Sequence, residues 1–451
     1  MSDLEHPTLE LHAVLGALGH ALDLTEGQPP GHCERAAWIG VALGREIGLD
    51  EEALRDLHYA VLLKDLGCSS NAARICELYV ADDLLFKRDF KLIDGSLSAA
   101  LRFVVDQTAK GQGLSERFRS ILHILQNGGE ISRELIETRC HRGAEIAGKL
   151  RFSVPVQDAV RSLDERWDGS GKPEGLEGSD IPLASRIALL AQVADVFHES
   201  GGRQAASNEI EARCGTWFDP DLCAAFLRLA KDASFWAPLA NDDPSDLAAH
   251  VPQTARTDID DDYLDDIAEA FADVVDAKSP FTAGHSHRVM LFSDMIAEEM
   301  TLGVDHRRRL RQATLLHDVG KLGVSNSILD KPGRPDEAEW AAIRMHPVHG
   351  RRILAQVPAL AHAASIAGTH HERLDGGGYP NGVGGDELGL DSRIASVADV
   401  FDALSAERPY RAAMPIPKAL AIMEEDRGKA FDPDCLDALR SALRRSQMLA
   451  A

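Results

Sequence analysis

The sequence predicts an all-α protein made of two tandem helical domains. Amphipathic helical spacing recurs along the chain, as in residues 262–277, where Ile267, Phe271, Val274 and Val275 fall on one face. Alternating, strand-like runs are scarce. Two blocks of sequence also occur twice in the same order, which indicates a duplicated unit.

Two further segments show the same helical pattern, and one segment excludes it. Residues 288–300 and 359–368 are predicted helices. Residues 375–391 contain seven glycines and Pro380, so we expect a long glycine-rich loop there.

The first repeated block lies near the start of each copy. GHSHRV at 284–289 matches GHCERA at 31–36, and LLHDVG at 315–320 matches LLKDLG at 62–67, both at an offset of 253 residues. Gapless agreement at one offset over two separate motifs indicates a tandem duplication.

The second block lies further along each copy. Residues 371–394 match residues 164–187 at an offset of 207, with 12 identical positions of 24. The first copy therefore carries 46 extra residues between Gly67 and Arg139. Residues 241–266 contain nine aspartates and are typical of a solvated linker, so we expect domains at 1–250 and 251–451.

Composition limits the function classes. The 451 residues carry a formal net charge of −24, which disfavours nucleic-acid binding as the main role. The N-terminus lacks a basic region before an apolar one, and no apolar run is long enough to span a membrane. Seven scattered cysteines without a CxxC pair suit a reducing compartment, so we expect a cytoplasmic protein.

Metal-ligand residue types are concentrated in the second copy. Imidazole and carboxylate together suit iron, manganese, zinc or nickel better than magnesium or calcium. Adjacent pairs such as His317 and Asp318 suit a centre of two metals, because one carboxylate can bridge both ions. The candidate ligands are His285, His317, Asp318, His346, His370, His371 and Asp399.

Four motifs of the second copy closely resemble the HD-GYP family, a branch of the HD phosphohydrolases that hydrolyses cyclic di-GMP. These are HDVGK at 317–321, HPVHG at 346–350, HHERLDGGGYP at 370–380 and RIASVADVFDAL at 393–404. The resemblance spans about residues 265–440. It implies an HD-type helical domain with the glycine-rich GYP loop over a cleft that holds two metals.

The resemblance also implies a role for each ligand. One metal would take His285, His317 and Asp399, the other His346, His370 and His371, with Asp318 bridging both.

Other residues would then serve the reaction. Asp318 and Lys321 would have catalytic roles, with Lys321 on the scissile phosphate, and Tyr379 would lie beside the substrate. Arg408 and Arg411 would grip the dinucleotide, although the family usually has lysine at the second position. Some members carry a glutamate for a third metal where this chain has Phe281, so we expect two metals, iron or manganese.

The expected function is therefore a cyclic di-GMP phosphodiesterase. A hydroxide bridging two metals is a nucleophile at neutral pH, and its attack would give pGpG; whether a second cut to GMP follows stays open. Two alternatives stay open: the same chemistry on 3′,3′-cyclic GMP-AMP, and a receptor with little turnover. A protein partner at the GYP loop and a homodimer are compatible with the sequence.

The first copy has lost most of this ligand set. In register, His32 and Asp65 keep their types, but Lys64 replaces His317 and Arg139 replaces His346. The other replacements are Cys68 for Lys321, Leu163 for His370, Asp164 for His371, Lys172 for Tyr379 and Gln192 for Asp399, although a three-residue slip would bring Asp195 to the last position. We expect cations in place of metals and a scaffold or regulatory role.

Overall fold

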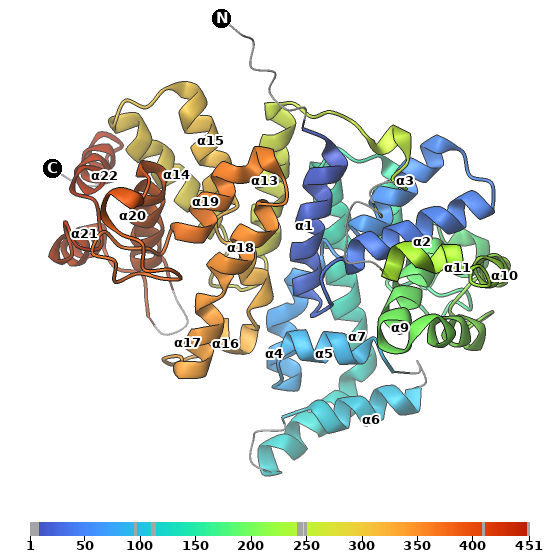
Figure 1. Ribbon diagram of the computed structural model, residues 1–451. Coiled ribbons are helices and arrows are strands. Elements are labelled where there is room, and N and C mark those ends of the chain that lie inside the picture. The colour runs from blue at the N-terminus through green and yellow to red at the C-terminus, as the bar shows by residue number, and fades with distance from the viewer. Residues whose placement is uncertain are drawn as a thin grey trace, which may run out of the picture. The chain divides into compact units, whose positions relative to one another are not determined.

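The computed structural model divides into two compact units, Met1–Asp260 and Asp261–Ala451, called here the N-terminal and the C-terminal unit. It describes residues 9–93, 97–109, 114–240, 247, 250–407 and 411–448. Over these ranges the regular elements are all helices, and β pairing is limited to three isolated bridges (Figure 1). The predicted all-α fold is confirmed.

The C-terminal unit is built around α14, which packs against α15, α20 and α22. Its core is aliphatic and aromatic, and α20 contributes Ile394, Val397 and Phe401, all fully buried. The helices of eight residues or more are α13 (Asp261–Asp276), α14 (His285–Glu299), α15 (Val304–Leu315), α17 (Glu337–Arg344), α18 (His346–Leu354), α19 (Ala361–Thr369), α20 (Leu390–Ser405), α21 (Ile416–Glu425) and α22 (Pro433–Arg445); α16 (Asn326–Leu329) is a single turn.

The helices predicted from periodicity are present with small shifts of their ends. The helix predicted at 262–277 is α13, that at 288–300 lies in α14, and that at 359–368 is α19. The glycine-rich loop ends at Leu390, where α20 begins, and contains one 3-10 turn at Gly385–Glu387.

The N-terminal unit repeats this arrangement, since α2 packs against α3 and α9 as α14 packs against α15 and α20. Its helices are α1 (Leu11–Thr25), α2 (His32–Glu46), α3 (Glu51–Leu62), α4 (Ala72–Tyr79), α5 (Asp83–Phe90), α6 (Leu97–Gln107), α7 (Leu114–Lys149), α8 (Val154–Arg161), α9 (Leu183–Ala212), α10 (Pro220–Leu229) and α11 (Ala233–Trp236). The bounds of α2 and α14, and of α3 and α15, both differ by 253 residues, so the sequence repeat is also a structural repeat.

The extra residues of the first copy form α4, α5, α6 and the first part of α7. They bury a small core of their own, which includes Ile75, Tyr79, Phe86 and Ile131. The insertion therefore stabilises itself through local apolar contacts and leaves the repeated helices intact.

Candidate metal centre

Three of the predicted ligands meet in the core of the C-terminal unit. His285 is the first residue of α14, His317 follows α15, and Asp399 lies on α20. Gly284 precedes α14 with a φ of 67°, a left-handed conformation that favours glycine. One ligand atom of each of the three lies within 4.8 Å of the other two, and all three residues are buried.

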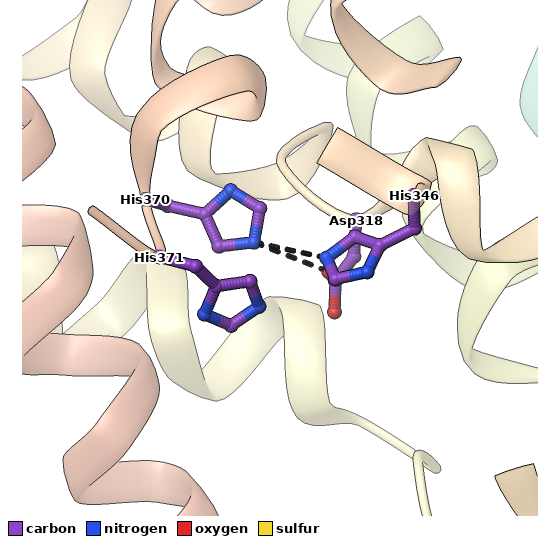
Figure 2. A group of neighbouring side chains, drawn as sticks. All are labelled: Asp318, His346, His370 and His371. Carbon is purple, nitrogen blue, oxygen red and sulfur yellow. Dashed lines mark hydrogen bonds and ion pairs between the residues drawn. The ribbon is translucent and has the colours of Figure 1, made fainter. Parts of the chain in front are cut away.

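A second group lies beside the first. Asp318, His346, His370 and His371 also place ligand atoms within 4.8 Å of one another. The Nε2 atoms of His346 and His370 face each other at 3.3 Å, and both face Asp318 Oδ1, at 3.4 and 3.6 Å (Figure 2). The two groups contain the seven residues that the sequence singled out.

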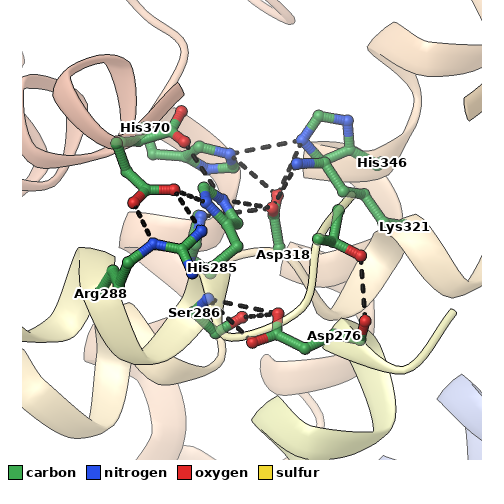
Figure 3. Close-up of polar contacts among 12 residues, drawn as sticks. Asp276, His285, Ser286, Arg288, Asp318, Lys321, His346 and His370 are labelled. Atoms are coloured by element: carbon green, nitrogen blue, oxygen red, sulfur yellow. Dashed lines mark hydrogen bonds and ion pairs between the residues drawn. The ribbon is translucent and has the colours of Figure 1, made fainter. Parts of the chain in front are cut away.

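Asp318 lies between the groups. Its Oδ2 is 3.3 Å from His285 Nε2 and 3.4 Å from His317 Nε2, whereas its Oδ1 faces the second group (Figure 3). A carboxylate with one oxygen toward each group is placed as a bridging ligand would be.

A close backbone approach makes this position possible. Gly320 packs so tightly that a Cβ atom there would lie 2.0 Å from the carbonyl oxygen of His346. Glycine therefore allows the segment that carries Asp318 to lie directly against the start of α18.

Three of the candidate ligand imidazoles are oriented through the ring nitrogen that faces away from the centre. His317 Nδ1 donates to the Thr314 carbonyl and His346 Nδ1 to the Ile343 carbonyl, both at 2.6 Å. His285 Nδ1 donates to Asp402 Oδ2 at 2.7 Å. These bonds orient the three rings so that Nε2 faces the centre, as in metal-bound histidines.

Asp402 connects one of these histidines to a cation. Its carboxylate joins His285 to Arg288, whose Nη2 donates to Oδ2 at 3.1 Å. It is a residue that orients a candidate ligand.

The donor set fits a divalent cation. Within the described part of the chain, the buried atoms without a hydrogen-bond partner include Nε2 of His285, Nε2 of His317 and Oδ1 of Asp318. Leaving such atoms unsatisfied costs about 1–3 kcal/mol each, whereas a cation would satisfy all three. Mixed imidazole and carboxylate donors suit manganese, iron, zinc or nickel.

The protonation states agree with this fit. Burial lowers the pKa of His346 to about 3 and holds that of His371 well below its usual value, so both rings are neutral. Burial alone would raise the pKa of Asp318, but His317 and Lys321 outweigh it and hold the pKa well below the usual range. Neutral imidazole and ionised carboxylate are the forms that bind metals.

His285 carries the proton that a cation would displace. Burial lowers its pKa, but the neighbouring carboxylates of Asp318, Asp399 and Asp402 outweigh burial and raise the pKa to about 10. Metal binding at this centre should therefore release a proton and weaken as the pH falls.

Of the residues predicted to contact the substrate, Lys321 and Tyr379 lie at the candidate centre, whereas Arg411 contacts the backbone. Lys321 pairs with Asp318, and the Tyr379 ring stacks on the His371 ring with centroids 4.8 Å apart. Arg411 donates instead to the carbonyls of Ala403 and Leu404 near the end of α20. Arg408 lies outside the described residues, so the role of the two arginines stays a prediction.

Glu372 serves the GYP loop. Its buried carboxylate accepts a hydrogen bond from the Asn381 N–H at 2.7 Å. It therefore fixes the loop that carries Tyr379.

Trp340 and Arg344 were not predicted as site residues. The Trp340 ring is 6.5 Å from the Tyr379 ring, and the Arg344 guanidinium is 5.7 Å from both rings. Only their position on the helix before HPVHG could have pointed to them, because their proximity to Tyr379 depends on the fold.

The corresponding pocket of the N-terminal unit is closed by ion pairs. The Lys64 ammonium lies 2.6 Å from Asp65 Oδ2, and Arg139 pairs with Asp164. These are the positions of His317, Asp318, His346 and His371 in the other copy.

The suggested slip at Asp195 is wrong. Asp195 Oδ2 accepts from His32 Nδ1 at 2.7 Å, and its Oδ1 accepts from Arg35 Nε at 2.8 Å. These are the bonds that Asp402 makes in the second copy, so Gln192 holds the position of Asp399 and this ligand is lost.

Comparisons with known proteins cover both units. A model of the HD domain family matches residues 111–222 and 269–435. The 3′3′-cGAMP-specific phosphodiesterase 3 of Vibrio cholerae is 52% identical over 97% of this chain and 95% of its own length. A cyclic di-GMP phosphodiesterase of Thermotoga maritima is 36% identical over 40% of this chain and 49% of its own length.

One solved structure is similar to this chain over nearly its whole length. The crystal structure of a cyclic GMP-AMP specific phosphodiesterase of V. cholerae aligns with a TM-score of 0.67 and 46% identity, over 97% of this chain and 98% of its own. Among the described residues, none of the helices combines the length and the hydropathy that a bilayer span needs. The chain belongs to the HD domain family, as a phosphohydrolase of the HD-GYP type in which the domain occurs twice and the first copy is degenerate.

Proposed function

We propose that this protein is a metal-dependent phosphodiesterase that hydrolyses 3′,3′-cyclic GMP-AMP. The observation that carries the proposal is the 52% identity, over 97% of the chain, to a V. cholerae phosphodiesterase specific for that dinucleotide. A second V. cholerae phosphodiesterase of the same specificity is 31% identical over 68% of this chain.

This substrate replaces the one that the motifs favoured. Sequence motifs alone put cyclic di-GMP first and kept 3′,3′-cyclic GMP-AMP as an alternative. The cyclic di-GMP phosphodiesterases of Xanthomonas campestris and T. maritima match only 35% and 40% of this chain. The shared motifs indicate the same hydrolytic reaction in all these proteins, and the identity over 97% of the chain favours 3′,3′-cyclic GMP-AMP as the substrate.

Two divalent cations, iron or manganese, would occupy the centre. The first would be held by His285, His317 and Asp399, the second by His346, His370 and His371, and Asp318 would serve both. When bound, the ions would supply water that is acidic enough to attack at neutral pH and positive charge to offset the charge developing on the phosphate.

The residues around the centre would serve one hydrolytic cut. A water oxygen attacks the phosphorus, the bond from phosphorus to the 3′ oxygen breaks, and the leaving oxygen takes a proton. The product is a linear dinucleotide with a 5′ phosphate. Lys321 would bring its ammonium to a non-bridging phosphate oxygen.

Tyr379 would act as a neutral donor beside the phosphate. Burial and the negative charges of Asp399 and Asp318 raise the pKa of its phenol, so the hydroxyl keeps its proton at physiological pH. A protonated hydroxyl can donate a hydrogen bond to an anionic substrate.

The N-terminal domain would act as a scaffold. Its pocket holds the buried pair of Lys64 with Asp65 and the partly buried pair of Arg139 with Asp164, so the charges there are balanced without a metal ion. The competing role is regulation of the second domain by a ligand bound to the first. A count of bound metals does not distinguish these two roles.

The test begins with metal content and product analysis. The full chain is purified without oxygen, loaded with iron or manganese, and given 3′,3′-cyclic GMP-AMP and cyclic di-GMP separately. We expect about two metals per chain and faster conversion of the mixed dinucleotide, followed by chromatography. Faster conversion of cyclic di-GMP would return the substrate to the motif-based expectation.

Asp318→Asn distinguishes an enzyme from a receptor. It should remove metal and turnover together, because one carboxylate serves both ions. Glu298→Gln, an exposed carboxylate on α14, is the matched control and should keep both. A metal-loaded wild-type protein that binds dinucleotide without converting it would support the receptor.

A further inference from the structure

A group of two aromatic rings and one guanidinium lies next to the metal centre. Trp340 and Arg344 are on α17, and Tyr379 is in the GYP loop. The Arg344 Cζ atom lies 5.7 Å from the centre of each ring, and the two rings are 6.5 Å apart at 61°. We call these three residues the aromatic platform.

The aromatic platform continues directly into the centre. Tyr379 stacks on the His371 ring at 29°, and it lies edge-on to His346 with centroids 6.5 Å apart. A phosphate held between the candidate ligands would thus place a neighbouring nucleoside within reach of Trp340.

The outer part of the aromatic platform is open to solvent. Trp340 is 42% exposed, and Arg344 is exposed as well. In the described part of the chain, Arg344 has no carboxylate partner. An exposed tryptophan beside an uncompensated guanidinium offers both a stacking face and a directed hydrogen-bond donor.

Local structure holds Trp340 in place. The start of α17 is a capping box, in which Asp336 accepts from the Glu339 N–H at 2.9 Å and Glu339 accepts from the Asp336 N–H at 2.7 Å. Lys331 also binds the Glu339 carboxylate at 2.6 Å. A helix fixed in this way presents Trp340 at little further cost in conformational entropy.

We infer that Trp340 and Arg344, together with Tyr379, form a subsite for one purine base of the dinucleotide, and that the base is guanine. Bases stack on aromatic rings whatever their identity, but a guanidinium pairs in bidentate fashion with O6 and N7 of guanine. At the same position adenine presents an amino donor, which repels the guanidinium. This inference rests on the proposed function, because it assigns the base next to the scissile phosphate.

The test separates base recognition from phosphate chemistry. Steady-state kinetics are measured on the metal-loaded full chain with 3′,3′-cyclic GMP-AMP and with methyl p-nitrophenyl phosphate, a diester that carries no base. Trp340→Ala should raise KM for the dinucleotide roughly tenfold, from the usual strength of base stacking, and leave the simple diester unchanged. Trp340→Phe keeps a stacking face and should restore most of the loss.

Arg344→Ala tests the identity of the base. It should lower kcat/KM for 3′,3′-cyclic GMP-AMP and cyclic di-GMP by roughly tenfold, the usual value of a bidentate base contact, and lower that for cyclic di-AMP much less. Equal losses on all three dinucleotides would overturn the assignment of guanine.

Other outcomes decide between the inference and the proposed function. Wild-type KM for the dinucleotide in both alanine variants would overturn the subsite, and so would equal losses on the dinucleotide and the simple diester. Failure of the metal-loaded wild type on both substrates would instead overturn the proposed function. Calorimetric binding of 3′,3′-cyclic GMP-AMP to the wild type and the variants would then decide the subsite.

Discussion

The pockets of the two copies share one half of their structure and differ in the other. His32 with Asp195 and His285 with Asp402 form the same buried pair, each with a nitrogen–oxygen distance of 2.7 Å. Both carboxylates also accept a hydrogen bond from an arginine one turn after the histidine, which is Arg35 on α2 and Arg288 on α14. This half is retained in both copies because it joins two core helices, whether or not a metal is bound.

The other half shows how a metal centre can be lost without unfolding the domain. In the first copy the Lys64 ammonium lies against Asp65, where His317 lies in the second. Burial disfavours the charge, but Asp65 and Cys33 outweigh it and raise the pKa of Lys64 above its ordinary value. A fixed cation of the protein thus neutralises the carboxylate that would otherwise need an ion.

Transferring this lysine to the active copy should have the largest effect. His317→Lys would place an ammonium beside Asp318 and exclude the ions by charge. We expect the metal count to fall toward zero and turnover to drop by at least about a thousandfold, because the nucleophile depends on the metals. Metal analysis and product chromatography check this.

The fold itself should survive that exchange, because the first copy contains the same pair. Circular dichroism of His317→Lys should match that of the wild type, and Glu298→Gln serves as the active control. Retained metal with full turnover would show that His317 is not a ligand.

Removing the lysine from the first copy should destabilise that copy. Lys64→Leu leaves Asp65 buried without its cation, and loss of one partner of a buried pair costs about 3–5 kcal/mol. Denaturant unfolding should show this loss, while the metal content of the folded protein stays unchanged. Adding Asp65→Leu should recover much of the stability, and no recovery would mean that the pair is not the cause.

A smaller effect should show that the retained histidine–aspartate pair serves the metal centre only in the second copy. Asp402→Asn would weaken the orientation of His285, and such changes usually cost about 10- to 100-fold in metal affinity or activity. Asp195→Asn makes the same change in the copy without a metal centre. It should lower stability and leave kcat and metal affinity unchanged, so equal kinetic losses in both variants would argue against a local role for Asp402.

The sequence predicted the fold and the candidate ligands because both depend on repeated patterns and on residue types at fixed spacing. It could not assign Asp402, because the bond to His285 joins residues 117 positions apart. The same limit applies to Asp195, for which only the hydrogen bonds to His32 and Arg35 excluded the slip. The contact of Trp340 with Tyr379 depends on how α17 meets the GYP loop, which no local pattern records.

The smallest expected effect concerns a buried histidine of the first copy that has no counterpart in the second. Burial, with a smaller contribution from His12, lowers the pKa of His58 to about 3, and its Nε2 lacks a hydrogen-bond partner. At the position in register, the second copy has Arg311, which pairs with Asp294 at 3.0 Å. Acid should therefore destabilise the first copy through a histidine that the second copy lacks at this position.

The sign follows from which state binds the proton. Between pH 6.5 and pH 3 the unfolded chain protonates His58 and the folded chain does not, so stability is present above the unfolded pKa and falls as the pH falls. At pH 5.5, one unit below the unfolded value, the loss should be about 1.3 kcal/mol relative to pH 7. His58→Leu should reduce this acid dependence by that amount in denaturant unfolding at the two pH values. An unchanged dependence in the variant would show that the acid sensitivity has another source.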